Sequence, residues 1–269
     1  PETSIHCCAG SAGSAEAAVQ AISSADAVVI DSTALATLFV LDELSLLQAM
    51  PMKCVVASGT LDELRGYLHS LEYGNREHKI LAKEEGKYVW ISVSAQDAAR
   101  YRRRVSSLIE TVEKICAVEP GTALADVTPE ERSRLVELFG QSGAESVALA
   151  RGQRRLLWAD DLALGAIAEK ECGVSRVWTQ AVVTWLAGRE HIGTGDADEV
   201  TVKLLVAGYF FTSLGPSAVL RAAQKASWDP SAAPLTAVAE HLVLPMIDGR
   251  KVWWVVGQSL ALLWRQASV

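Results

Sequence analysis

The chain has 269 residues and a formal net charge of −7, with 32 acidic against 25 basic side chains and a sequence pI of about 5.3. Its hydrophobic content of 50% is enough to bury one large core, or one core with an appendage. The acidic balance excludes a general nucleic-acid coat, although a local basic patch is sufficient to hold a phosphate backbone. No uncharged apolar run approaches the roughly 18 residues of a membrane span, so we expect no membrane contact.

The pattern of apolar residues predicts alternating strands and helices. Short apolar runs rich in β-branched residues predict strands at 27–30, 53–57, 88–93, 154–159 and 174–178. Helices are expected between them, at 32–50, 61–70, 95–117, from Thr128, from Glu145 and at 162–172. This order indicates an α/β fold with a parallel central sheet and helices on both sides.

The two ends of the chain differ from this alternating region. Residues 1–25 are rich in Ala, Ser and Gly and are expected to form a linker or an N-terminal helix. From residue 196 to 269 only helical signals remain, which predicts a helical C-terminal extension packed on the domain. Its last helix, at 251–266, is apolar over most of its circumference and includes Trp253 and Trp254. Such a helix predicts burial in the core, with a homodimer or interdomain interface as the alternative.

Five acids stand where predicted strands end or helices begin: Asp31, Glu63, Glu145, Asp160 and Asp161. The carboxyl ends of parallel strands share one edge of a sheet, where α/β proteins bind ligands. Carboxylates gathered there stay ionised when a divalent cation offsets their charge, and oxygen ligands favour Mg²⁺ or Mn²⁺. Such an ion lowers the pKa of a bound water. The pattern therefore predicts a metal-dependent enzyme that acts on phosphodiesters.

Each acid also has a purely structural interpretation. Asp31 and Glu145 suit the positive end of a helix, and Glu63 suits a solvated helix position. The adjacent pair Asp160 and Asp161 is the hardest to explain in this way, because two carboxylates directly after an apolar strand are unfavourable unless they cap a helix or bind a metal.

Two groups of arginines also have both a structural and a functional interpretation. Those close to the acids are candidates for contacts to a substrate backbone: Arg65, Arg151, Arg154 and Arg155. The others form either a solvated helix face or a phosphate-contacting patch: Arg100, Arg102, Arg103 and Arg104.

Four motifs in chain order resemble those of the PIN-domain ribonucleases: VVIDSTAL, TLDELRGYL, SGAESVALA and LLWADDLALGAIA. The resemblance is closest to the branch whose last two acids stand side by side. It implies a Rossmann-like fold and hydrolysis of RNA, expected to be single-stranded, at a Mg²⁺ or Mn²⁺ site formed by the five acids. It also matches Thr33 or Ser32, beside the first acid, and Thr179, after the last strand, to hydroxyl residues of the family.

The resemblance covers about residues 26–215, with the PIN-like domain expected at 26–195. Residues 75–127 depart from the compact form of the family and are expected to be an insertion. The alternative function is a catalytically silent PIN-like module that binds RNA or a protein.

The five cysteines, odd in number and without Cys-x-x-Cys spacing, predict reduced thiols in a cytoplasmic protein. Because the chain begins at Pro1 without a signal-peptide pattern, we expect a segment of a longer protein whose other domains are partners.

Overall fold

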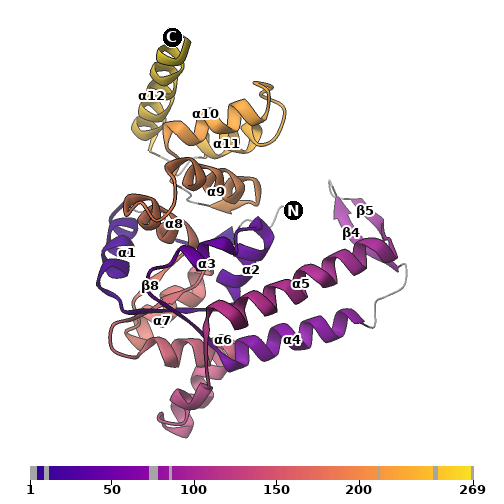
Figure 1. Ribbon diagram of the computed structural model, residues 1–269, viewed down its shortest axis with the longest axis vertical. Helices are drawn as coiled ribbons and strands as arrows, with labels where there is room; N and C mark the ends of the chain where they lie inside the picture. The colour runs from indigo at the N-terminus through magenta and orange to yellow at the C-terminus, as the bar shows by residue number, and fades with distance from the viewer. Residues whose placement is uncertain are drawn as a thin grey trace.

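The computed structural model describes residues 5–8, 12–72, 78–84, 87–210, 213–244 and 248–267. Helices surround a central sheet and form the body of the molecule, and a long helical arm projects from one side of this body (Figure 1). The C-terminal helices form a separate layer beyond the body (Figure 1). Within the described part of the chain, no helix is both long enough and apolar enough to cross a membrane.

The central sheet has five parallel strands in the order β6-β3-β2-β7-β8. Their bounds are Ala27–Ile30 for β2, Lys53–Ala57 for β3, Ala117–Glu119 for β6, Arg155–Trp158 for β7 and Arg176–Val177 for β8. The chain first builds outward from β2 through β3 to β6, and then returns to add β7 and β8 on the other side of β2. The direction of growth therefore reverses between the neighbouring strands β2 and β7. Their carboxyl ends form the topological switch point, where open α/β sheets bind ligands.

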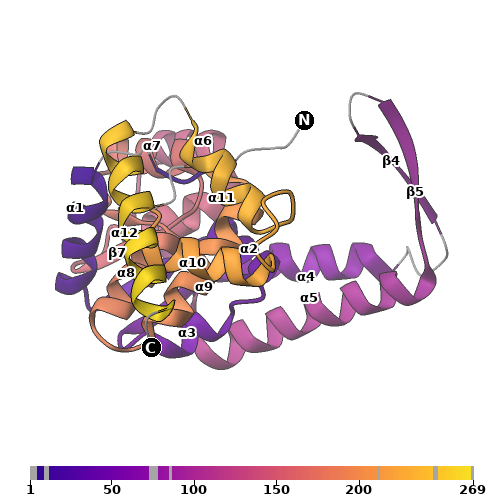
Figure 2. The same ribbon diagram turned by 90° about the horizontal axis from the view of Figure 1, so that it is seen from above.

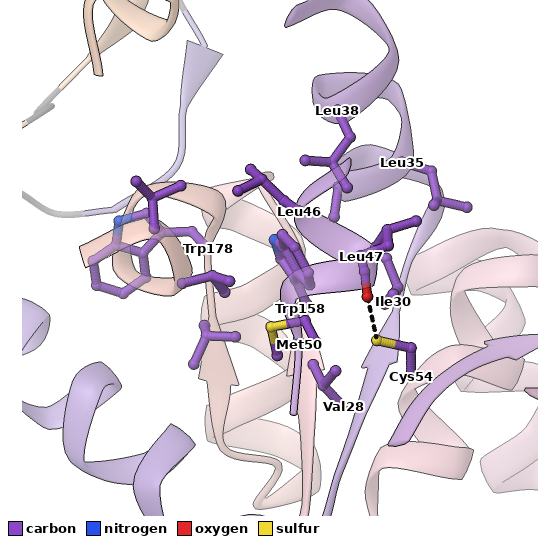
Figure 3. Close-up of a cluster of buried hydrophobic side chains, with 14 of the residues drawn as sticks. Val28, Ile30, Leu35, Leu38, Leu46, Leu47, Met50, Cys54, Trp158 and Trp178 are labelled. Carbon is purple, nitrogen blue, oxygen red and sulfur yellow. Dashed lines mark hydrogen bonds between the residues drawn. The ribbon is translucent and has the colours of Figure 1, made fainter. Parts of the chain in front are cut away.

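Successive residues of the inner strands face two different cores, because side chains alternate across a sheet. One face carries Val28, Ile30 and Trp158, which pack with helices on that side in the larger core. Figure 3 shows this cluster, with Trp158 completely buried beneath helix α2. The opposite face carries Val29 and Leu157, which pack against helices α6 and α7. Burial on both faces explains why these strands read as continuous apolar runs.

The helices of the body are α1 Ala12–Ser24, α2 Ser32–Leu41, α3 Ser45–Ala49, α4 Ser58–Glu72, α5 Ala95–Ile115, α6 Pro129–Ala150, α7 Leu162–Cys172 and α8 Thr179–Gly188, with a 3₁₀ turn at Gly121–Leu124. The predicted α/β fold, with a parallel sheet flanked by helices, is confirmed. Two predicted helix ends are also confirmed. The Thr128 hydroxyl accepts a hydrogen bond from the Glu131 amide at the start of α6, and Gly173 ends α7 with φ 66°.

Two predictions about local structure are wrong. The third strand of the sheet is β6 and not the stretch 88–93, which belongs to strand β5, Lys87–Val93. Strand β5 instead pairs antiparallel with β4, His78–Glu84, in a hairpin at the far end of the arm (Figure 2). Glu145 does not begin a helix either. Helix α6 runs through it, and the break lies at Gly140, whose φ of 70° is a conformation that glycine adopts without strain.

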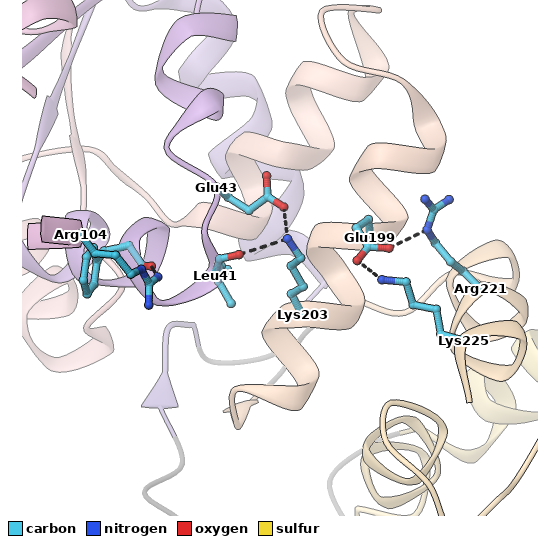
Figure 4. A network of polar contacts seen from close by, with 8 residues as sticks. Leu41, Glu43, Arg104, Glu199, Lys203, Arg221 and Lys225 are labelled. Atoms are coloured by element: carbon cyan, nitrogen blue, oxygen red, sulfur yellow. Dashed lines mark hydrogen bonds and ion pairs between the residues drawn. The ribbon is translucent and has the colours of Figure 1, made fainter. Parts of the chain in front are cut away.

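The C-terminal layer contains α9 Thr194–Val206, α10 Pro216–Lys225, α11 Leu235–Leu242 and α12 Gly249–Ala267. Helix α9 is attached to the body through Lys203, whose ammonium lies 2.7 Å from Glu43 and donates to the Leu41 carbonyl at the end of α2 (Figure 4). On its other side, Glu199 pairs with Arg221 at 2.8 Å and also with Lys225, both on α10 (Figure 4). The two-residue strands β1, Ile5–His6, and β9, Tyr209–Phe210, pair in parallel in a small second sheet that was not predicted; we call it the β1–β9 ribbon.

The predicted burial of the last helix is wrong for most of its large side chains. Helix α12 packs on α10 along one side only, where Val255 and Ser259 are buried. The side chains of Trp253, Leu260 and Trp264 are 79%, 61% and 77% exposed. The apolar pattern is compatible with burial on several sides, but within the described residues the main packing partner of the helix is α10.

This contrast gives a matched pair of substitutions. Leu38→Ala removes a fully buried side chain from the larger core and should lower the free energy of unfolding by about 2–5 kcal/mol. Leu260→Ala removes the same atoms from an exposed position and should change it by less than about 0.5 kcal/mol. Urea unfolding followed by circular dichroism measures both, and equal losses in the two variants would contradict the structure.

Candidate functional site

Two of the predicted acids meet at the switch point of the sheet. Asp31 follows β2 directly, and Asp160 comes two residues after β7, so both lie at the carboxyl edge of adjacent strands. Their side chains are almost completely buried, at 1% and 2% exposure. Buried carboxylates at such an edge are unusual, because charged groups lose hydration there unless partners replace it.

Asp31 is the N-cap of helix α2, and this role uses only one of its two oxygens. Its Oδ1 accepts hydrogen bonds from the Thr33 amide at 2.7 Å and the Ala34 amide at 3.4 Å, and also from the Thr33 hydroxyl. The structural interpretation of Asp31 as a helix cap is therefore confirmed. Its Oδ2 is buried and has no hydrogen-bond partner within the described residues. A buried oxygen left in this way is available to a ligand.

Asp160 is held by Thr179, at the start of α8. Its Oδ1 accepts from the Thr179 amide at 2.7 Å, and its Oδ2 accepts from the Thr179 hydroxyl at 2.5 Å. Thr33 connects the two acids, since its hydroxyl donates to Asp31 and accepts from the Asp160 amide at 2.9 Å. Thr33, one of the two residues that the resemblance offered beside the first acid, and Thr179 thus fix the orientation of both carboxylates.

Burial changes the acidity of both carboxyl groups. It raises the pKa of Asp31 to about 6 against the lowering effect of its hydrogen bonds, and the neighbouring Asp160 adds to the rise. Burial also raises the pKa of Asp160, although the Thr179 hydrogen bonds oppose it. A positive charge at this point would relieve both effects. The unpartnered Asp31 Oδ2, beside a second carboxylate, fits a hard divalent cation that prefers oxygen ligands.

The adjacent Asp161 has a different environment from Asp160. It is exposed, and its Oδ1 accepts from the Leu164 amide at 2.9 Å as the N-cap of α7. Both acids nevertheless line one cavity of about 650 Å³. The same cavity is lined by Thr37 and by Tyr209 of strand β9, whose hydroxyls are hydrogen-bonded to each other. No signal in the sequence marks Tyr209, because the strand that places it is only two residues long.

Glu145 and Glu63 lie at the interface of α4 and α6. Glu145 is buried and accepts from the Gly59 amide at 2.8 Å, at the start of α4, and from the Gln141 side chain at 2.8 Å. A Cβ at Gly59 or Gly121 would approach the Glu145 carboxyl group to 2.5 or 2.4 Å, so a side chain at either position would displace that carboxyl group. Glu63 is exposed and accepts from the Ser142 hydroxyl at 2.6 Å.

The structure therefore brings Asp31 and Asp160 together and gives Glu63 and Glu145 partners within the chain. Across the described residues, no three Asp, Glu, His or Cys side chains form a group that could hold a metal ion. Arg154 and Arg155, named as candidates for substrate contacts because of their closeness in sequence, do not lie near Asp160. Both stand at the start of β7, at the opposite edge of the sheet from Asp160, and pair with Asp26 and Glu119. A strand of four residues spans roughly 13 Å, so closeness in sequence did not mean closeness in space.

A parallel sheet with buried acids at its switch point defines this protein as a Rossmann-like α/β domain with a polar site at the carboxyl edge. Within that class, residues 29–170 match the family model described as the PIN domain associated with the TPR-GreAB-C-PIN system. The match covers more than half of the chain and includes all five predicted acids, and the chain belongs to the PIN-domain family. No curated protein and no solved structure matches the chain.

Asp31→Asn should stabilise the metal-free protein at neutral pH. The folded-state pKa of about 6 lies above the ordinary 3.8, so the stability that the protonated carboxyl contributes is complete below about pH 4 and is lost as the pH rises through 6. Two pH units correspond to about 3 kcal/mol. The variant, which cannot ionise, should exceed the wild type by up to this amount at pH 7.5 and by little at pH 4, in urea unfolding with EDTA present.

The exposed Asp161→Asn is the control for this measurement, because asparagine preserves the helix cap. It should follow the wild type at both pH values. An Asp31→Asn variant with the same pH dependence as the wild type would contradict the assignment of the shift to Asp31.

Proposed function

We propose that this protein is a Mg²⁺- or Mn²⁺-dependent ribonuclease that hydrolyses single-stranded RNA in the cytoplasm. The observation that supports the proposal most directly is the Asp31–Asp160 pair, buried at the switch point of a PIN-family sheet with one carboxylate oxygen unpartnered. Two buried carboxylates side by side are unfavourable unless a cation or protons compensate them.

In this proposal Asp31 and Asp160 hold the ion, and Asp161 lies beside them on the wall of the cavity. The remaining predicted ligands, Glu63 and Glu145, belong to the same proposal as groups that would exchange their present partners for the metal. A bound ion of this kind supplies positive charge for the leaving oxygen and a water of lowered pKa. No side chain then has to act as a nucleophile.

The chain's own residues orient the reaction. Thr33 and Thr179 fix the orientation of the two carboxylates through hydrogen bonds, and Asp31 keeps its Oδ2 without a partner in the described residues. Pre-organised charged groups need little reorganisation during the reaction. The cavity beside Asp160 is large enough for part of a nucleotide chain, given that ligand pockets commonly measure about 300–1,000 Å³.

The second candidate function is a catalytically silent PIN-like module that binds RNA or another protein. The partners of Glu145 favour it, because this acid is engaged with the Gly59 amide and the Gln141 side chain. The acids in the described residues also form no group of three for a metal. Titration with Mn²⁺ separates the two functions: the ribonuclease should bind at least one ion, and Asp31→Ala should abolish that binding.

Asp31→Asn and Asp160→Asn should each reduce Mn²⁺-dependent cleavage of a labelled single-stranded RNA by at least about 100-fold, because each removes a charged ligand from the proposed metal site. The matched control is Asp26→Asn, at the opposite end of the same strand β2, where the carboxylate is exposed and pairs with Arg154. This variant should cleave like the wild type. Unchanged cleavage in both site variants would refute the proposal.

A further inference from the structure

The arm of the molecule is a second surface with a distinct chemistry. We define the arm as residues 65–104, which comprise the outer parts of α4 and α5 and the β4–β5 hairpin. Figure 2 shows the two helices side by side, with the hairpin beyond their ends and away from the C-terminal layer. The buried residues of α5 lie only in its second half, from Val105 to Val112, so its first half is outside the core.

The outer part of the arm is basic in an otherwise acidic protein. Between Lys79 and Arg104 the sequence contains seven lysines and arginines but only three acids, although the whole chain carries a net charge of −7. Basic residues concentrated on one projecting element are the electrostatic signature of contact with a phosphate backbone.

Strand β5 presents two large aromatic side chains on one face. Tyr88 and Trp90 alternate along the strand and are 72% and 66% exposed. The hairpin register pairs Tyr88 with Lys83, and it pairs Ser92, one step beyond Trp90 on the same face, with Lys79. Exposed aromatics between basic positions form a platform on which bases stack while cations meet the phosphates.

Three of the arginines of α5 differ in their partners. Arg104 is engaged with the body: it donates to the Phe39 carbonyl at 2.9 Å and lies 4.7 Å from the Phe39 ring. Arg100 pairs with Asp97 at 2.6 Å on the exposed surface, where such a pair contributes little. Arg103 is exposed and makes no ion pair within the described part of the chain. Arg103 is therefore an exposed cation whose charge is not neutralised by an ion pair within the described residues.

An aromatic chain fixes the arm relative to the candidate site. Tyr101 of α5 packs edge-on against Phe39 of α2 with ring centres 5.7 Å apart, and its hydroxyl lies 3.2 Å from that of Tyr67 on α4. Helix α2 is the helix that Asp31 caps. The arm is thus anchored on the element that also carries the buried acid.

We propose that the arm binds single-stranded nucleic acid, with bases stacked on Tyr88 and Trp90 and the phosphate backbone contacted by Arg103 and the exposed Lys87. The proposal rests on the proposed function for the identity of the strand as RNA, but it does not require cleavage. Exposed aromatic residues also mark protein interfaces, and the local positive charge favours the polyanion.

The test measures binding of a fluorescein-labelled 20-nucleotide oligouridylate by anisotropy, with EDTA present so that metal-dependent cleavage is absent. The double variant Tyr88→Ala/Trp90→Ala should weaken binding at least tenfold, because base stacking on each aromatic is worth several-fold. Arg103→Glu leaves the hairpin sequence intact and should weaken binding several-fold and reduce its salt dependence, while Arg103→Lys should restore both. Circular dichroism confirms that each variant is folded.

The control is Trp253→Ala/Trp264→Ala, which removes two equally exposed tryptophans from α12. It should bind RNA like the wild type. Wild-type affinity in the arm variants, an equal loss in the α12 control, or an arm variant that changes only the oligomeric state would overturn the proposal. If the arm variants lose RNA binding but the wild-type protein hydrolyses no RNA, only the proposed ribonuclease function is refuted. If the protein hydrolyses RNA but the arm variants bind it as the wild type does, only the arm proposal is refuted.

Discussion

The burial of two carboxylates beside each other is the constraint on which the rest of this structure depends. Asp31 and Asp160 lie where the sheet changes its direction of growth, and their charges face little water. Thr33 and Thr179 stabilise them, and the same hydrogen bonds begin α2 and connect α8 to the end of β7. The site is therefore part of the framework of the fold. Because the Asp31 Oδ2 is buried without a hydrogen-bond partner in the described residues, the folded protein is less stable than it would be with a neutral residue at this position.

Glu145 shows how an acid can serve the framework more directly. Its carboxylate lies between Gly59, in the first turn of α4 after β3, and Gly121, which begins the 3₁₀ turn after β6. It thus holds together the two loops on one side of the sheet edge, while Asp31 and Asp160 occupy the other side. The acids of this family pattern consequently have unequal environments, from the buried Glu145 to the exposed Asp161.

The sequence predicted those features that local chemistry determines. The strands 27–30 and 53–57, the Thr128 cap and the Gly173 helix end each depend on a few neighbouring residues, and all are present. Features that depend on distant neighbours were missed. Strand β6 is only three residues long and its middle residue, Val118, is exposed, so it lacks the apolar pattern of a buried strand, and the exposure of Trp253 depends on what packs beside α12. For the candidate site, sequence placed Asp31 and Asp160 at one edge, but it had no means to foresee that Glu63 and Glu145 have partners on the α4–α6 interface.

The β1–β9 ribbon has a consequence for the order in which the site is completed. Ile5 pairs with Tyr209, so one wall of the cavity joins segments about 200 residues apart in the chain. Contacts of such long sequence separation form late, because the intervening loop has to be ordered first. During synthesis, the acids of the sheet edge are therefore made before the strand β9 that closes one wall of the cavity. A ribosome has to translate through Phe210 before the newly made domain encloses its own site.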